Sequence, residues 1–146
     1  MTGDAVDAQG PLPGVPGSPV RVLVVDDHPL VRTALAARLS DEDDLTIVGE
    51  CEDGCEVVEA AERLRPDVVV MDVSMPVMDG LAATEALRAV DPGARVIMLT
   101  GEGAAARPGA AAAGARAVVP KGTPADGLLR CLRTVLHGGD GCPFCL

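Results

Sequence analysis

Five polar residues of this sequence stand where short apolar runs end, and their types suit phosphoryl chemistry. They are Asp26, Asp27, Asp72, Thr100 and Lys121. If the apolar runs are strands of an open parallel sheet, their carboxyl ends meet at one edge and form a ligand crevice. We therefore expect these side chains to lie close together.

The carboxylates of such a group would repel one another unless a cation lay between them. Oxygen-only ligands with room for water suit Mg²⁺. Lys121 supplies a positive charge and Thr100 a hydroxyl donor for a phosphoryl group, and Asp72 can act as a carboxylate nucleophile that forms an acyl phosphate. Lys121 is the only lysine beside eleven arginines. Its place at the end of an apolar run favours a functional role.

The elements that would position these residues follow a regular alternation. Apolar, β-branched runs predict five strands, and each is followed by a helical pattern or a turn into one. The expected strands cover 20–25, 45–49, 68–72, 95–100 and 115–120. Thr123 is expected to cap the last helix, with Pro124 at its first position. Five β-α repeats predict an α/β fold with a doubly wound parallel sheet and helices on both faces.

The fourth helical segment, between Thr100 and Gly114, fits this pattern poorly. Pro108 and Gly109 in mid-helix would together cost about 4 kcal/mol relative to alanine. We expect a weak or broken helix there.

Length and composition narrow the class of protein. The 146 residues suffice for one domain, and a net charge of −10 with one aromatic residue, Phe144, argues against nucleic-acid binding. There is no membrane-spanning apolar run and no signal peptide, so a cytoplasmic location is expected. Residues 1–19, rich in Gly and Pro, are expected to be a disordered leader.

Four stretches of the chain, at 24–32, 71–80, 99–100 and 120–122, resemble the receiver (CheY-like) domain of bacterial two-component response regulators. The Asp-His-Pro-Leu-Val-Arg sequence at residues 27–32 is similar to that of the LuxR/NarL-type branch. The resemblance covers about residues 20–137. It implies a flavodoxin/CheY-like strand order of 2-1-3-4-5.

The resemblance also implies roles for residues. Asp72 would be the phospho-acceptor, taking its phosphoryl group from a histidine kinase or phosphotransfer protein, and Thr100 and Lys121 would contact the phosphoryl oxygens. The Mg²⁺ ligands would come from Asp26, Asp27, Asp72 and the backbone carbonyl of Ser74. The protein would catalyse only its own phosphorylation and dephosphorylation. It would signal through an unknown protein partner, and a homodimer is one open possibility.

Two features depart from that family. Val118 stands three residues before the lysine, where receivers usually carry Tyr or Phe, so the aromatic switch is missing. Only 25 residues follow Lys121, whereas a helix-turn-helix output domain needs roughly 60 more, so no DNA-binding domain is expected.

Three other interpretations remain open. Val118 and the poor fourth helix favour an interaction module that works without phosphorylation. An aspartyl phosphatase of the haloacid-dehalogenase type is weakly supported, because Ser74 stands where those enzymes have a second Asp. The Cys142-Pro-Phe-Cys145 sequence has zinc or redox spacing but lies in an expected flexible tail, 138–146. Zinc would need two more ligands, for which His137, Cys131 or a second subunit are candidates.

Overall fold

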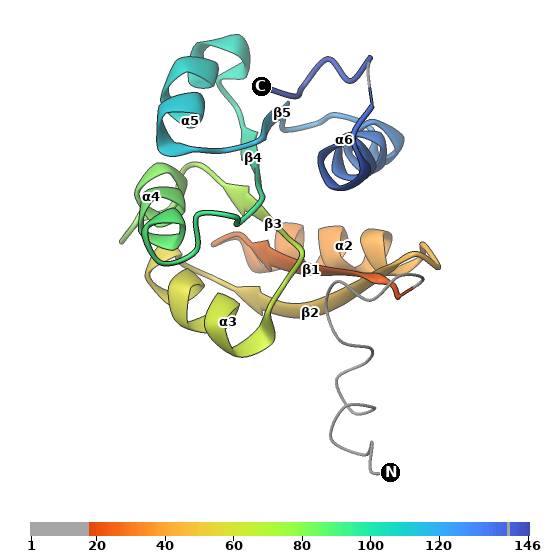
Figure 1. Cartoon of the computed structure of the whole chain (residues 1–146), viewed down its shortest axis with the longest axis horizontal. Coiled ribbons are helices and arrows are strands. Elements are labelled where there is room, and N and C mark those ends of the chain that lie inside the picture. The colour runs from red at the N-terminus through yellow and green to blue at the C-terminus, as the bar shows by residue number, and fades with distance from the viewer. Residues whose placement is uncertain (1–17, 140) are drawn as a thin grey trace, which may run out of the picture.

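The computed structural model describes residues 18–139 and 141–146, and it contains one five-stranded sheet (Figure 1). All strand pairs within the sheet are parallel, and the order is β2-β1-β3-β4-β5. The strands are β1 (Val20–Val25), β2 (Leu45–Cys51), β3 (Val68–Asp72), β4 (Val96–Thr100) and β5 (Ala117–Pro120). The predicted fold class and strand order are confirmed. The leader expected at 1–19 lies outside the described residues except for its last two positions.

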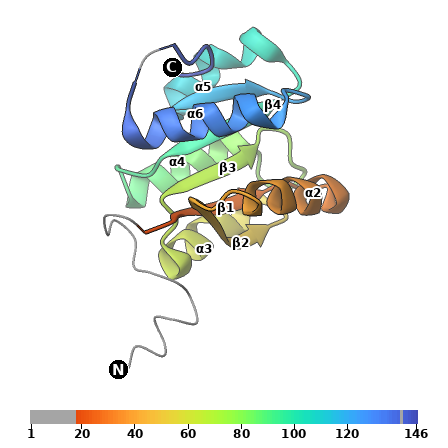
Figure 2. The same cartoon turned by 90° about the vertical axis from the view of Figure 1, so that its right-hand side faces the viewer.

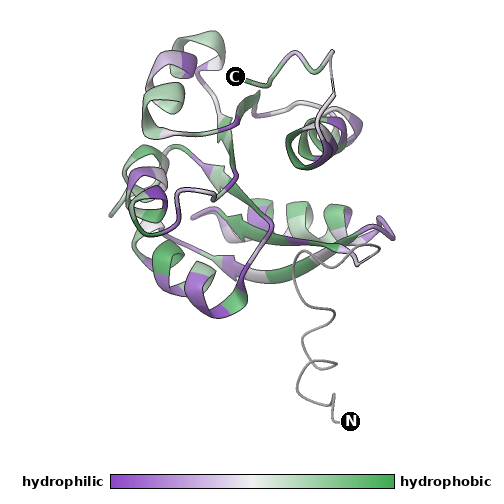
Figure 3. Cartoon of the chain, in the orientation of Figure 1, coloured by the Kyte–Doolittle hydropathy of each residue, from purple (hydrophilic) through white to green (hydrophobic). Residues whose placement is uncertain are grey.

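Helices cover both faces of the sheet (Figures 1 and 2). The α-helices are α2 (Pro29–Ser40), α3 (Val57–Leu64), α4 (Gly80–Val90), α5 (Arg107–Ala113) and α6 (Ala125–His137). Leu23, Val25 and Met71 pack in the core under α3, α4 and α5. Val22 and Val24 point the other way, into the core shared with α2 and α6. Burial on both faces explains why the central strands β3 and β4 are apolar along almost their whole length, and the edge strand β2 is more mixed, as Figure 3 shows.

The segment after β4 is a short turn and a short helix, as the sequence predicted. A 3-10 turn (Gly103–Ala106) precedes α5, which has seven residues. Pro108 lies in the first turn of α5, where its missing N–H loses no helical hydrogen bond. Gly114 ends the helix at φ 99°, and its N–H bonds to the carbonyls of Ala110 and Ala111.

The predicted cap of the last helix is wrong. Helix α6 begins at Ala125 and Pro124 precedes it, without a capping side chain. The Thr123 hydroxyl instead donates to the Pro120 carbonyl at 2.7 Å. Thr123 therefore closes the turn after β5, where its hydroxyl and its backbone N–H both donate to the Pro120 carbonyl.

The residues after α6 return to the sheet. The Val118 N–H donates to the Phe144 carbonyl at 3.0 Å, and the Leu146 N–H donates to the Arg116 carbonyl at 2.9 Å. Cys145 forms an antiparallel bridge with Ala117. The C-terminal residues therefore lie along the outer edge of β5. No helix in the described part of the chain is long and apolar enough to cross a membrane.

Candidate functional site

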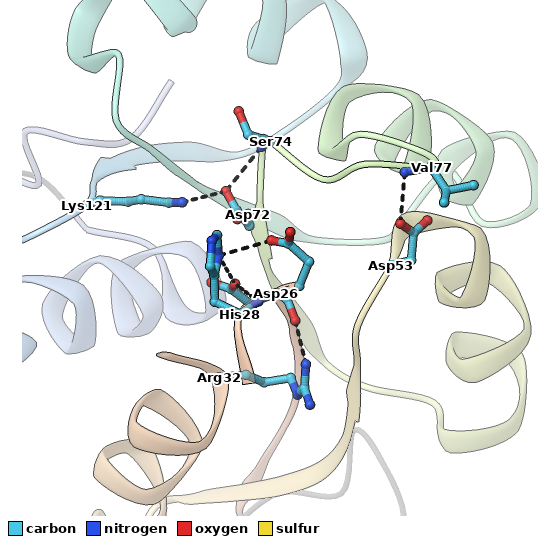
Figure 4. A network of polar contacts seen from close by, with 9 residues as sticks. Asp26, His28, Arg32, Asp53, Asp72, Ser74, Val77 and Lys121 are labelled. Carbon is cyan, nitrogen blue, oxygen red and sulfur yellow. Dashed lines mark hydrogen bonds and ion pairs between the residues drawn. The ribbon is translucent and has the colours of Figure 1, made fainter. Parts of the chain in front are cut away.

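The carboxyl ends of the central strands lie at one edge of the sheet and carry the predicted residues (Figure 4). Asp72 is the last residue of β3 and pairs with Leu99 of β4. The next residue of β4, Thr100, pairs with Pro120 of β5. Lys121 comes next in the chain, and its backbone N–H donates to the Thr100 carbonyl at 2.7 Å. The strand register therefore fixes the acidic and basic groups relative to one another.

The two carboxylate oxygens of Asp72, which is fully buried, have different surroundings. Oδ1 accepts the Ser74 backbone N–H at 3.1 Å and lies 2.9 Å from Nζ of Lys121 (Figure 4). Oδ2 is also buried but has no hydrogen-bond partner within the described residues. One oxygen is thus anchored, and the other has its lone pairs available.

The turn after β1 places two more carboxylates beside Asp72. Asp26 is buried, and its Oδ1 accepts the backbone N–H of His28 at 2.8 Å. Nδ1 of His28 lies 3.2 Å from Oδ1 of Asp26 and 3.1 Å from Oδ1 of Asp27. The Arg32 guanidinium donates to the Asp26 carbonyl at 2.7 Å and so holds the turn. One ligand atom each of Asp26, Asp27, His28 and Asp72 lies within 4.8 Å of the others.

The donor atoms of this cluster fit a hard cation. Oδ2 of Asp26, like Oδ2 of Asp72, is buried and accepts no hydrogen bond from the described part of the chain. Burying an unpaired charged oxygen is costly, and adjacent carboxylates repel one another. A divalent cation with oxygen ligands removes both costs, which is the chemistry that Mg²⁺ offers.

Thr100 is buried, and its Oγ1 accepts the backbone N–H of Glu102 at 3.0 Å. Its hydroxyl hydrogen remains available to a further acceptor. A groove beside the site is lined by residues that include Asp27, Ser74 and Glu102. A partner could therefore approach the carboxylates from this side.

The loop between β3 and α4 is held by Asp53, which lies in the turn after β2. Its carboxylate accepts backbone N–H groups from Cys55 at 3.0 Å and from Val77 and Met78, each at 3.1 Å (Figure 4). The Cys55 N–H and these loop N–H groups hold the pKa of Asp53 below its usual value. Asp53 thus joins the turn after β2 to the loop after Asp72.

The other end of that loop is fixed by Asp79 and Gly80. The Asp79 side chain caps α4 by accepting the Ala82 N–H at 2.8 Å. A Cβ at position 80 would collide with the carbonyl oxygen of Asp72 and lie 2.9 Å from the Cα of Val73. Only glycine lets the helix begin this close to the end of β3.

Comparison with known proteins decides the family. Residues 22–133 match the model of the response regulator receiver domain. The chain belongs to this family. Receivers accept a phosphoryl group on aspartate in two-component systems, and the site described above lies at the expected end of the sheet.

Individual relatives support the assignment. The receiver is 48% identical over 81 residues to the response regulator GacA of Pseudomonas viridiflava, covering 56% of this chain and 38% of that protein. It thus spans about two fifths of the length of this curated relative. A LuxR-family response regulator from Aurantimonas sp. SI85-9A1 is similar in structure, with 31% identity, a TM-score of 0.80, and coverage of 86% of this chain and 91% of that one.

A third relative was solved with ligands. The CheX-CheY-BeF3-Mg+2 complex from Borrelia burgdorferi matches with 27% identity and a TM-score of 0.74, over 80% of this chain and 89% of that one.

The receiver's predicted residues are brought together, with one unforeseen neighbour. Asp26, Asp27, Asp72 and Lys121 form one cluster, and the Ser74 backbone contacts it. His28 was expected to orient the acidic turn or to be exposed, and not to be a ligand, yet its ring lies close to the carboxylates of Asp26 and Asp27. Its position directly after the Asp pair was the only sequence signal for this contact.

Val118, the departure from the family pattern, is buried on β5. Its side chain belongs to the core under α3, α4 and α5. A valine there packs as a core residue and has no polar group that could reach the site. This receiver therefore has a buried aliphatic side chain three residues before Lys121, opposite Met98 of β4.

Proposed function

We propose that Asp72 of this receiver accepts a phosphoryl group from the phosphohistidine of a histidine kinase or phosphotransfer protein. One observation carries the proposal: a buried carboxylate has one oxygen anchored by Lys121 and Ser74, and its other oxygen has no partner among the described residues. A nucleophile needs such a fixed, available lone pair.

The step is an in-line displacement at phosphorus. Oδ2 of Asp72 forms a new P–O bond while the P–N bond to the donor imidazole breaks, and the bonding pair leaves with the imidazole nitrogen. Lys121 and the Thr100 hydroxyl are placed to donate to the phosphoryl oxygens, where negative charge is concentrated. Their backbone link, the Lys121 N–H to the Thr100 carbonyl, keeps the two donors in a fixed relation.

We propose that Asp26, Asp27, Asp72 and the backbone carbonyl of Ser74 hold Mg²⁺. When bound, Mg²⁺ would offset the repulsion among the carboxylates and neutralise charge on the phosphoryl oxygens. The buried Oδ2 of Asp26, which accepts no hydrogen bond within the described residues, supports this assignment. So does the similarity to the CheX-CheY-BeF3-Mg+2 complex from Borrelia burgdorferi, which contains Mg²⁺.

The phosphorylated receiver would act in the cytoplasm through contact with a downstream protein. Its chemistry would be confined to its own acyl phosphate. Because Val118 replaces the usual aromatic residue, the signal would pass through the backbone that joins Thr100 and Lys121 rather than through a rotating ring.

Intact-mass spectrometry after incubation with acetyl phosphate and Mg²⁺ tests the proposal. We expect one phosphoryl adduct on the wild-type protein and on the matched control Asp91→Asn, whose side chain caps a distant turn. Asp72→Asn and a chelator-treated sample should show none.

The second candidate, a module that works without phosphorylation, is favoured by Val118 and by the short helix α5. A folded protein that gains no adduct from acetyl phosphate, does not bind beryllofluoride and accepts nothing from purified histidine kinases would support that candidate and overturn the first.

A further inference from the structure

Three thiols from different parts of the chain meet beside β5, away from the carboxylate cluster. Cys131 is fully buried on α6, and Cys142 and Cys145 are half-buried in the C-terminal segment. All three are free thiols, and their Sγ atoms lie within 4.8 Å of one another. The structure thus adds Cys131 to the Cys-Pro-Phe-Cys sequence.

The fold builds this cluster from the backbone upward. Cys131 points into the core that α6 shares with the sheet. After α6 the backbone takes positive φ at Gly138, Gly139 and Gly141, which allows the chain to reverse. The two hydrogen bonds to β5 and the bridge from Cys145 to Ala117 then hold the segment against the sheet edge.

We propose that Cys131, Cys142 and Cys145 bind one Zn²⁺ ion as thiolates, with the fourth position open to water or an exogenous ligand. Zn–S bonds of about 2.3 Å in a tetrahedral site place the sulfurs roughly 3.8 Å apart. The present cluster needs only small side-chain shifts to reach that spacing.

A disulfide would join two of these thiols and leave the third unused. The convergence of all three on one point is what a metal site requires, and the Cys-x-x-Cys spacing is common in zinc sites. This favours the metal over the disulfide.

The charge of such a site has a neighbour that can offset it. Binding as thiolates releases a proton from each thiol, so Zn²⁺ with three thiolates carries a net charge of −1. The Arg107 guanidinium donates to the Cys145 carbonyl at 3.0 Å, and so lies close to the cluster.

Hydrogen bonds within the cluster lower the pKa of one thiol, whereas burial raises the pKa of the other two. Burial alone would raise the pKa of Cys142, but a backbone hydrogen bond involving Phe144 and the thiols of Cys145 and Cys131 outweigh it and lower that pKa. Burial raises the pKa of Cys131 and is the main cause that raises the pKa of Cys145.

Bound zinc would fasten the C-terminal segment to the sheet. The Leu146 N–H and the Val118 N–H bond across the junction between this segment and β5. Both should exchange with solvent deuterium more slowly when zinc is bound, because opening the junction would then require loss of a metal ligand.

The test uses the full, freshly reduced protein in excess Mg²⁺, which occupies oxygen sites but competes poorly for thiolates. We add one equivalent of Zn²⁺, remove unbound metal by gel filtration and measure zinc per chain. One equivalent should remain on the wild type and on Cys55→Ser, which removes an exposed thiol outside the cluster. Cys142→Ser and Cys145→Ser should lose it.

Co²⁺ is the second probe. It should give thiolate-to-metal charge transfer and intense tetrahedral d–d bands in the wild type, and neither in Cys142→Ser. Because Cys142 and Cys145 are only half-buried, both variants should fold, and a denaturant titration checks this. Zinc retained by the Cys142→Ser, Cys145→Ser double variant would overturn the proposal. The proposal would also be overturned if the reduced wild-type protein took up no zinc. The same holds if two of its thiols formed a disulfide, seen as a loss of two hydrogens in mass, instead of binding zinc.

Discussion

The cluster at the sheet edge depends on how each side chain uses its oxygen atoms. Lys121 and Ser74 engage one oxygen of Asp72, and the Arg32 guanidinium anchors the backbone turn that carries Asp26. The buried oxygens that have no partner in residues 18–139 and 141–146 are the ones that the proposed chemistry would use. Asp53 has the opposite role, since its oxygens are occupied by the loop N–H groups of Cys55, Val77 and Met78.

The first prediction concerns the pH dependence of Asp53. Its pKa in the folded state lies below the ordinary value of about 3.9 for aspartate. The ionised carboxylate therefore stabilises the fold at neutral pH, and this contribution is lost as pH falls below about 4 through the folded-state pKa. Asp53→Asn should lower the free energy of unfolding by about 1 kcal/mol at neutral pH, a modest value because solvent screens the site.

Urea unfolding at a series of pH values measures this difference. The gap between wild type and Asp53→Asn should narrow in acid, whereas Asp43→Asn, which removes one exposed carboxylate, should show no comparable gap. A gap that stays constant down to about pH 2 would contradict the assignment.

At the scale of elements, α5 is the weakest part of the frame around the site. It has seven residues and contains Gly109, which is expensive in a helix because glycine has the most backbone freedom to lose. A Cβ at position 109 would meet only the methyl groups of Leu81, at 3.7 and 3.9 Å, which is ordinary contact.

The second prediction follows from that space. Gly109→Ala should raise the free energy of unfolding by about 0.5 kcal/mol. Gly114→Ala is the matched control of opposite sign, because φ is 99° there and its Cβ would crowd the Arg88 side chain. It should cost about 1 kcal/mol or more. Thermal or denaturant unfolding measures both changes. If Gly109→Ala lowered the free energy of unfolding, the glycine would not be what limits the stability of α5.

The sequence predicted the elements better than their ends. Apolar runs bounded by Asp, Pro and Gly located all five strands, and Pro108-Gly109 correctly indicated a poor helix. The Thr123 cap was wrong because Pro124 is the residue that precedes α6, and the Thr123 hydroxyl donates within the turn after β5. The Asp53 clamp could not be foreseen, since it joins loops 24 and 25 residues apart.

The site itself was predictable to a similar degree. Strand ends carry Asp72, Thr100 and Lys121 to one edge, and that follows from parallel topology alone. The contact of Cys131 with Cys142 and Cys145 needed the reversal after α6, which residue spacing does not define.

For the whole molecule, the proposed Mg²⁺ site would link folding stability to the concentration of the metal. In the absence of a cation, folding brings Asp26, Asp27 and Asp72 together and their charges oppose it. A ligand that binds only the folded state adds RT ln(1 + [L]/Kd) to stability.

The third prediction uses this linkage. At an Mg²⁺ concentration about ten times its Kd, the free energy of unfolding should rise by about 1.4 kcal/mol over a chelated sample. Asp27→Asn should lose most of this rise, whereas Asp43→Asn should keep it. An equal rise in Asp27→Asn would place the metal elsewhere.

The most direct test of the central claim is chemical trapping of the acyl phosphate. Borohydride reduces an aspartyl phosphate to homoserine, so peptide mapping of the phosphorylated, reduced protein identifies the residue that carried the group. We predict homoserine at position 72 and at no other aspartate. Homoserine at position 26 or 27, or unmodified Asp72 in protein that carries a phosphoryl adduct, would contradict the assignment of Asp72 as the acceptor.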